Sequence, residues 1–148
     1  MSRSVLVGLL LVACGPSAGD DGEACSKADV VVSGALVGLD RSECDPCPLD
    51  ASYAWITLET TCEPGIEWTA SSCLIDVMRA TNLATREEST FEIPECPAGD
   101  IMWTVAPGDP MAAGGPLVRD IVDEPGDYAF VAELISELDP AMFEGAVQ

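Results

Sequence analysis

Short stretches in which apolar and polar residues alternate recur along most of this chain, and turns rich in proline and glycine separate them. Alternation at period two is typical of strands with one buried face, and β-branched and aromatic residues favour strands further. The stretch 52–60 is the clearest example. Its two faces are Ala54, Ile56 and Leu58 on one side and Tyr53, Trp55 and Thr57 on the other. The predicted strands are 29–39, 52–60, 66–69, 73–81, 90–93, 101–105, 117–122 and 128–135.

Seven or eight short strands without an amphipathic helix predict an all-β fold, a single antiparallel β-sandwich. The domain is expected to span 25–138, with at most a helical turn within 136–143 and a C-terminal tail at 139–148. The predicted core consists of Val32, Ile56, Ile75, Val77, Phe91, Ile93, Trp103, Val105, Phe130 and Leu134. Within 73–81 the alternation places Ile75 and Val77 on one face and Met78 on the other.

Three segments resemble parts of immunoglobulin-like and fibronectin-type domains. They are Thr90-Phe91-Glu92-Ile93-Pro94, Pro97-Ala98-Gly99-Asp100 and Pro125-Gly126-Asp127-Tyr128, which is followed by the closing strand. The resemblance is one of pattern and implies an immunoglobulin-like sandwich. The Cys–Trp–Cys order of true immunoglobulin domains is not present, because Trp103 and the cysteines fall in a different order.

The first residues of the chain have a different character from the rest. Arg3 gives a positive start, Val5–Ala13 is an almost unbroken apolar run, and Cys14 and Gly15 follow. A run this short does not cross a bilayer core, which needs about 20 residues. It matches the apolar region of a signal peptide, with small residues at the cleavage point. A buried element of the domain and an ordinary secretory signal that is cut elsewhere are the alternatives.

The stretch Leu11-Val12-Ala13-Cys14 resembles the lipobox of bacterial lipoprotein signals. This resemblance implies export, removal of residues 1–13 and attachment of lipid to Cys14. Residues 14–24, small and polar, are then expected to form a flexible tether. The implied location is the bacterial cell envelope, where the acyl chains anchor the protein to the membrane. Because Gly15 rather than Asp follows Cys14, the enterobacterial sorting pattern implies the outer membrane.

The chain carries 26 acidic and 6 basic residues, a formal net charge of −20. Such a surface repels phosphate backbones, which excludes nucleic-acid binding. It is suited to a basic protein partner or to divalent cations. The acidic cluster most similar to a calcium-binding loop is Asp20-Asp21-Gly22-Glu23, but its acidic residues do not have the spacing of such a loop. No cofactor is expected apart from the lipid on Cys14.

Six cysteines remain after Cys14: Cys25, Cys44, Cys47, Cys62, Cys73 and Cys96. An even number in an exported chain predicts three disulfides, for which fifteen connectivities are open. We expect Cys62 to pair with Cys73, because both flank a turn-rich segment that contains Pro64-Gly65.

The sequence predicts no catalysis. Histidine is absent, and Lys27, the only lysine, has no serine three residues before it, so the common nucleophile–base arrangements are missing. One alternative is a thiol–disulfide redox protein that uses Cys44 and Cys47, but Asp45 between them would raise a thiol pKa and no helix start is expected there. A second alternative is a protease inhibitor that presents the Pro/Gly-rich loop 106–116.

The remaining candidates are aromatic and thioether side chains. Three tryptophans, Trp55, Trp68 and Trp103, are expected in the core or half-buried, and one exposed beside Tyr53 would mark a binding face. A copper(I) site formed by Met78, Met102 and Met111 is disfavoured by their irregular spacing. The sequence therefore predicts a lipid-anchored envelope protein that acts as a non-catalytic binding or structural module.

Overall fold

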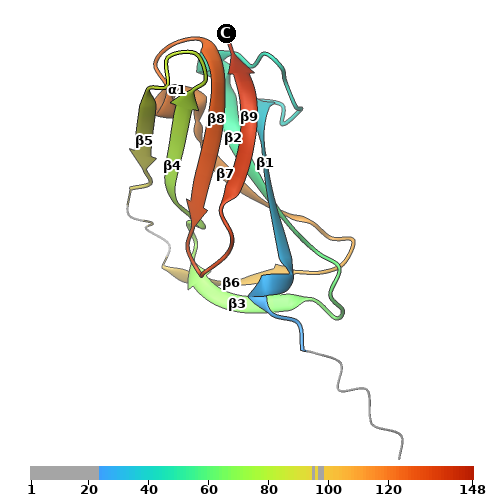
Figure 1. Ribbon diagram of the computed structural model, residues 1–148. Helices are drawn as coiled ribbons and strands as arrows, with labels where there is room; N and C mark the ends of the chain where they lie inside the picture. Colours follow the sequence, from blue (N-terminus) through green and yellow to red (C-terminus); the bar gives the residue numbers. More distant parts are fainter. Residues whose placement is uncertain (1–23, 95, 97–98) are drawn as a thin grey trace, which may run out of the picture.

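The computed structural model describes residues 24–94, 96 and 99–148, and the described chain is mostly strand (Figure 1). The predicted signal peptide 1–13, Cys14 and nearly all of the tether 14–24 lie outside these residues. The elements are η1 (Lys27–Asp29), β1 (Val30–Gly38), η2 (Leu49–Ala51), β2 (Ser52–Thr60), β3 (Ile66–Ser71), β4 (Ile75–Asn82), β5 (Glu88–Glu92), β6 (Asp100–Val105), β7 (Met111–Leu117), α1 (Val118–Ile121), β8 (Gly126–Leu134) and β9 (Ala141–Val147).

The nine strands form three sheets. One sheet has the order β1-β2-β7, a second has the order β5-β4-β8-β9, and β3 and β6 form a separate two-stranded ribbon. Every strand ladder is antiparallel. The prediction of an all-β, antiparallel fold is therefore confirmed, with nine strands in the described part where seven or eight were expected.

The buried core contains residues of all three sheets, and it follows the predicted alternation most closely in β2. Ala54, Ile56 and Leu58 are completely buried, as one face of the strand should be. Of the other predicted core residues, Ile75, Trp103, Val105 and Phe130 are buried, whereas Val32, Phe91, Ile93 and Leu134 are partly buried and pack against the core.

The predicted faces of β4 are wrong beyond its first residue. Ile75 is buried as expected, but Val77 is only half-buried and Met78 is fully buried. The pairing of β4 with β8 shifts register between Ile75 and Val77. Such an irregularity moves the following side chains to the opposite face, and sequence alternation alone does not reveal it.

Four local predictions in the second half of the chain are wrong. The loop 106–116 ends early, because β7 begins at Met111. The predicted strand 117–122 is instead the helical turn α1, whose residues Val118 and Ile121 are buried at helical spacing. The helical turn predicted within 136–143 is absent, since Ser136 and Glu137 have positive φ. The stretch 139–148 contains the strand β9 instead of a tail.

Three disulfides are present, as predicted, but the expected Cys62–Cys73 bond is wrong. The bonds are Cys25–Cys62, Cys44–Cys47 and Cys73–Cys96. Val30 pairs with Thr60, which brings Cys25 to Cys62 at the same end of β1 and β2. The ribbon β3–β6 separates Cys62 from Cys73, because Ser71 pairs with Asp100 and so places Cys73 beside Cys96.

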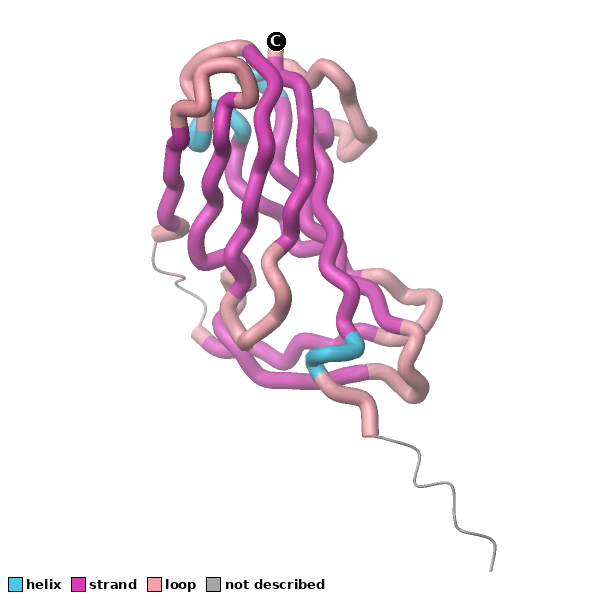
Figure 2. The backbone as a smooth tube through the Cα atoms, viewed as in Figure 1, coloured by secondary structure: helices cyan, strands magenta, loops and turns pink. Residues whose placement is uncertain are grey.

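The two larger sheets approach closely where β1 lies beside β9 (Figure 2). Gly34 of β1 faces the ring of Phe143, and Gly145 of β9 faces Leu36. A Cβ atom on Gly145 would lie 2.5 Å from Cδ1 of Leu36. A larger residue at either position would therefore force Phe143 or Leu36 to move. Phe143 in turn stacks on Phe130 with ring centroids 5.1 Å apart.

Candidate functional site

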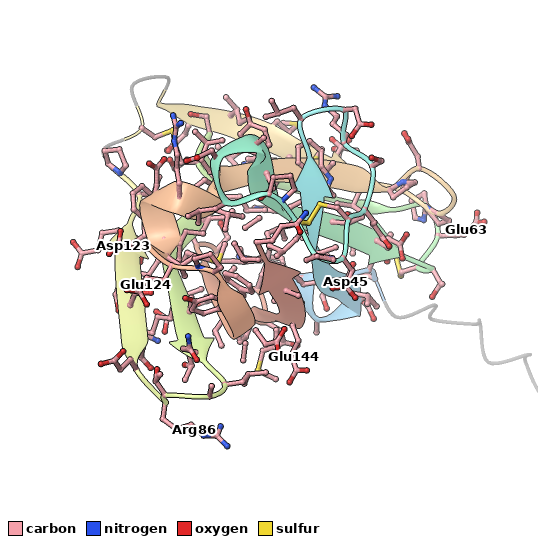
Figure 3. The ribbon with its side chains drawn as sticks, turned by 90° about the horizontal axis from the view of Figure 1, so that it is seen from above. Asp45, Glu63, Arg86, Asp123, Glu124 and Glu144 are labelled. Atoms are coloured by element: carbon pink, nitrogen blue, oxygen red, sulfur yellow. A yellow bond between two sulfur atoms is a disulfide. The ribbon has the colours of Figure 1, made fainter. Side chains whose placement is uncertain are left out.

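The end of the domain opposite the point where residue 24 enters it (Figure 1) carries about half of the acidic residues that the structure describes. Asp45, Asp123 and Glu124 are among those labelled in Figure 3. We call this end of the domain the distal end; it consists of the connections 39–51, 83–87 and 122–125 and the strand ends beside them. Its acidic residues are Asp40, Glu43, Asp45, Asp50, Glu87, Glu88, Asp120, Asp123, Glu124 and Asp127. Three of the five described basic residues, Arg41, Arg86 and Arg119, lie at this end as well, so that acids exceed bases there by seven. A basic partner would find favourable potential at this end.

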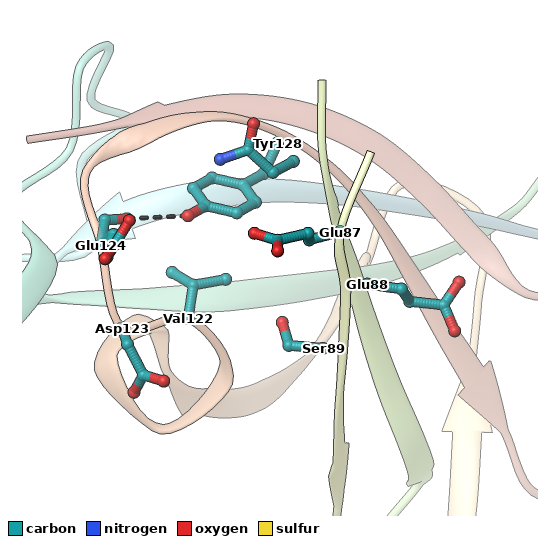
Figure 4. A pocket seen from close by; sticks show the side chains of 8 residues that line it. Glu87, Glu88, Ser89, Val122, Asp123, Glu124 and Tyr128 are labelled. Atoms are coloured by element: carbon teal, nitrogen blue, oxygen red, sulfur yellow. Dashed lines mark hydrogen bonds between the residues drawn. The ribbon is translucent and has the colours of Figure 1, made fainter. Parts of the chain in front are cut away.

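A cleft with a volume of about 230 Å³ lies within the distal end (Figure 4). We call it the acidic cleft; it is lined by Asn82, Glu87, Glu88, Ser89, Val122, Asp123, Glu124 and Tyr128. Tyr128 is 5% exposed, and its hydroxyl donates a hydrogen bond of 2.8 Å to the backbone carbonyl of Glu124. This bond fixes the 122–125 connection against β8, so that one wall of the cleft is held by a buried side chain.

The opposite wall is held by Asn82 at the end of β4. Its side-chain oxygen accepts hydrogen bonds from the backbone of Ala84 at 2.9 Å and of Thr85 at 3.1 Å. Asn is favoured in turns because its side chain bonds the backbone two residues later. The backbone N–H of Asn82 also donates to the carbonyl of Glu87 at 2.9 Å. These bonds close the β4–β5 turn and present Glu87 and Glu88 at the rim.

The cleft offers carboxylates without a matching cation. Four acidic residues line it and, among the described lining residues, none is basic. Glu87 points toward Tyr128, whereas the side chain of Glu88 points away from the cleft (Figure 4). Arg86 extends from the tip of the β4–β5 turn, away from Asp123 and Glu124 (Figure 3). In the described ranges, no group of three or more His, Cys, Asp or Glu side chains is arranged to hold a metal ion. The arrangement suits several separate contacts to lysine or arginine side chains.

The sequence pattern did not reveal this cleft. The stretch 82–88 lies between the predicted strands 73–81 and 90–93, and 117–122 was predicted to be a strand, so the two segments had no visible relation. The sequence feature that could have indicated the cleft is a pair of adjacent acidic residues in each turn, Glu87-Glu88 and Asp123-Glu124. Only the pairing of β4 with β8, which sets Asn82 opposite Tyr128, brings the two turns together.

The predicted redox pair, Cys44 and Cys47, lies in the connection between β1 and β2. Cys47 is fully buried, and its backbone N–H donates to the carbonyl of Ala146 at 2.7 Å. The N–H of Gln148 donates back to the carbonyl of Cys47 at 2.9 Å. The disulfide thus fastens a short segment along β9, beside the place where β1 and β9 meet. Cys47 has no solvent access, whereas Cys44, the N-terminal cysteine of the pair, is only partly buried.

The connection that was expected to present a protease-binding loop is a tight turn. Between β6 and β7 only Ala106–Pro110 remains, and the N–H of Asp109 donates to the carbonyl of Ala106 at 3.0 Å. Gly108 adopts φ +74°, the left-handed region that favours glycine. Residues 111–116 belong to β7, so the segment available to a protease is much shorter than predicted.

The aromatic and thioether candidates lie apart. Trp68 and Trp103 stack within the β3–β6 ribbon at 6.5 Å between ring centroids. Trp55 lies beside Tyr53 on β2, half-buried, and the guanidinium carbon of Arg41 lies 5.4 Å from its ring centroid. Arg41 therefore occupies one face of the Trp55 ring. The three methionines considered for a copper site differ in burial. Met78 on β4 is buried in the core, Met102 on β6 is exposed, and Met111 at the start of β7 is partly buried. The buried Met78 and the exposed Met102 therefore do not form a common copper site.

Comparison of the chain with protein-family models, curated proteins and solved structures finds no match. Among the helices that the structure describes, none has the length and apolar character needed to cross a membrane.

Proposed function

We propose that this protein is a lipid-anchored binding module of the bacterial cell envelope, attached to the outer membrane, that binds a basic protein partner at its distal end without catalysis. The anchor is the lipidated Cys14, the tether is 14–24, and the domain is an immunoglobulin-like β-sandwich. The proposal joins the lipobox-like leader, the sheet topology and the acidic cleft.

Two observations support an immunoglobulin-like sandwich. The sheet orders β1-β2-β7 and β5-β4-β8-β9 correspond to the strand orders A-B-E and C′-C-F-G of immunoglobulin-like domains. The bond from the Tyr128 hydroxyl to the Glu124 carbonyl corresponds to the tyrosine corner at the start of strand F in that fold. In this comparison β3 and β6 are additions that extend the connections on either side of β4 and β5.

The position of the tether is consistent with presentation of the distal end. Residue 24 enters the domain beside η1, at the end that carries the β3–β6 ribbon (Figure 1). The ten residues 14–23 reach about 35 Å when extended. A domain anchored in this way keeps the acidic cleft on the side away from the bilayer, where a partner has access.

The acidic cleft is the observation that carries the choice of partner. Four carboxylates without an intervening base favour a ligand that brings several positive charges. Because the described carboxylates are not arranged as a metal site, a protein with exposed lysine and arginine side chains fits better than a divalent cation. The rim position of Glu87, Glu88, Asp123 and Glu124 gives each of them access to such a partner.

The test is to recover partners from native bacterial envelope with the acylated full chain as bait. A cleft variant carries Glu87→Gln, Glu88→Gln, Asp123→Asn and Glu124→Gln. A matched control carries Glu59→Gln, Glu63→Gln, Glu67→Gln and Asp139→Asn, which remove the same charge from exposed positions outside the cleft. We expect one stoichiometric basic partner, retained by the control and lost by the cleft variant, with binding that weakens as salt increases.

Equal retention by the two variants would exclude the cleft, and an acidic or uncharged partner would exclude the charge argument. A Cys14→Ser bait tests the anchor separately. If it recovers the same partner from detergent extract but no longer co-fractionates with the membrane, the anchor and the binding site are independent parts of the proposal.

A further inference from the structure

The strand β7 leaves one edge of its sheet open. In the described part of the chain β7 pairs with β2 alone, and its other edge has no strand neighbour. The edge strand of the other large sheet, β5, carries Glu88 and Glu92, whereas β7 carries no charged residue. Edge strands are commonly protected from added strands by charges, bulges or proline. Over Met111–Gly114 the open edge of β7 has neither charge nor proline, and the register irregularity against β2 and Pro116 are confined to the end of the strand after Gly114.

An apolar groove lies beside this edge. Its volume is about 240 Å³, and the described residues that line it are all uncharged: Ser72, Cys73, Leu74, Ile75, Ile93, Trp103, Ala112, Ala113 and Gly114. The groove has a fixed wall, because the indole N–H of Trp103 donates to the carbonyl of Ser71 at 3.1 Å. The helical turn α1 contacts both β7 and β5. It therefore fills the space between these two edge strands at the distal end.

We propose that β7 and this groove bind an extended peptide segment of a partner protein by strand addition. The open edge offers backbone N–H and C=O groups in alternation, and a polypeptide backbone is the ligand that pairs with both. Every second side chain of the added strand would point into the groove, since side chains alternate across a strand. The groove selects apolar side chains of modest size at those positions.

The charge of the chain favours a basic occupant. The described lining of the groove is uncharged, and the chain as a whole carries a formal net charge of −20. A segment with lysine or arginine flanking its apolar residues is therefore complementary to the acidic domain. A second copy of this chain is disfavoured as the occupant, because it would bring the same net charge of −20.

The test uses the oxidised full chain in detergent and a phage-displayed library of random twelve-residue peptides. We expect selection of sequences with alternating apolar residues and basic flanks. Hydrogen exchange with a synthetic copy of a selected peptide should slow at the backbone amides of Met111–Gly115. Ala112→Lys places a charge on the β7 edge and should weaken binding at least tenfold. Thr90→Lys, the matched change on the β5 edge, should alter it less than twofold.

The exchange measurement on the unaltered chain decides the matter even if Ala112→Lys fails to fold. The proposal is overturned if the library gives no extended sequence, if protection appears away from β7, or if a folded Ala112→Lys variant binds as tightly as Thr90→Lys. Because the cleft variant used for the proposed function retains β7 intact, loss of cleft binding and loss of strand addition are separate results.

Discussion

The hydroxyl of Tyr128 donates a hydrogen bond of 2.8 Å to the backbone carbonyl of Glu124, four residues earlier in the chain. This bond joins the start of β8 to the connection that supplies Asp123 and Glu124 to the acidic cleft. A buried hydrogen bond of this kind contributes about 1 kcal/mol to the free energy of unfolding. The structure thus links the stability of the domain to the shape of its candidate site.

Tyr128→Phe should lower the free energy of unfolding by about 1 kcal/mol, because the carbonyl of Glu124 loses its donor while the ring remains. Tyr53→Phe, at a half-buried tyrosine on β2, is the matched control and should change the free energy by less than about 0.5 kcal/mol. Chemical denaturation followed by tryptophan fluorescence measures both. An equal loss in the two variants would show that the Tyr128 bond contributes nothing specific.

Gly145→Ala should destabilise the domain by about 1–3 kcal/mol, since the added methyl group would overpack against Leu36 where β1 meets β9. Gly114→Ala is the control, because its Cβ would lie 3.4 Å from the Trp55 ring, an ordinary contact. Thermal unfolding compares the two. If Gly145→Ala is tolerated as well as Gly114→Ala, the close approach of β1 and β9 is incorrect.

Removal of the Cys25–Cys62 bond should cost about 2 kcal/mol more than removal of Cys44–Cys47. The reason is that the first bond closes a separation of 37 residues and the second a separation of 3. Paired cysteine-to-alanine variants, compared by denaturation, measure the difference. The redox alternative makes a further prediction, namely that Cys44–Cys47 is reduced selectively under mild conditions. Three bonds of equal resistance to reduction would remove that alternative.

The hydroxyl and then the backbone N–H of Ser42 donate to Asp40 and hold the pKa of its carboxyl below the ordinary value of 3.8. Because the folded pKa is lowered, this contribution to stability is present above pH 3.8 and is lost as pH falls through the folded value. Titration followed by NMR should give Asp40 a pKa below 3.8, and Ser42→Ala should raise it toward 3.8. Identical titration of the two proteins would contradict these bonds.

The sequence predicted what depends on local pattern. In β2 the residues alternate strictly and one face is buried, so Ile56 was assigned to the core correctly. Ala54 and Leu58, which share its face, are buried with it. In β4 the register shift against β8 places Met78 instead of Val77 in the core. No residue pattern within 73–81 indicates such a shift. Val118 and Ile121 also read as strand positions, because a four-residue helical turn is too short to show its period.

Features that depend on the pairing of strands far apart in the chain could not be predicted from the sequence. The bond Cys62–Cys73 was expected across the Pro64-Gly65 turn, but β3 pairs with β6 and carries the chain away from Cys62. The acidic cleft likewise exists because β4 and β8 are neighbours. Its residues were visible only as acids in two turns, 82–88 and 122–127, among many others in so acidic a chain.

The central claim is that the domain is carried on a lipid anchor at Cys14, which leaves six cysteines to form three disulfides outside the cytoplasm. Intact mass spectrometry of the protein isolated from bacterial envelope tests it most directly. The account predicts a chain that begins at Cys14, carries the mass of attached acyl chains and lacks six hydrogens relative to the reduced form. A chain that begins at Met1 with unmodified, reduced cysteines would contradict it.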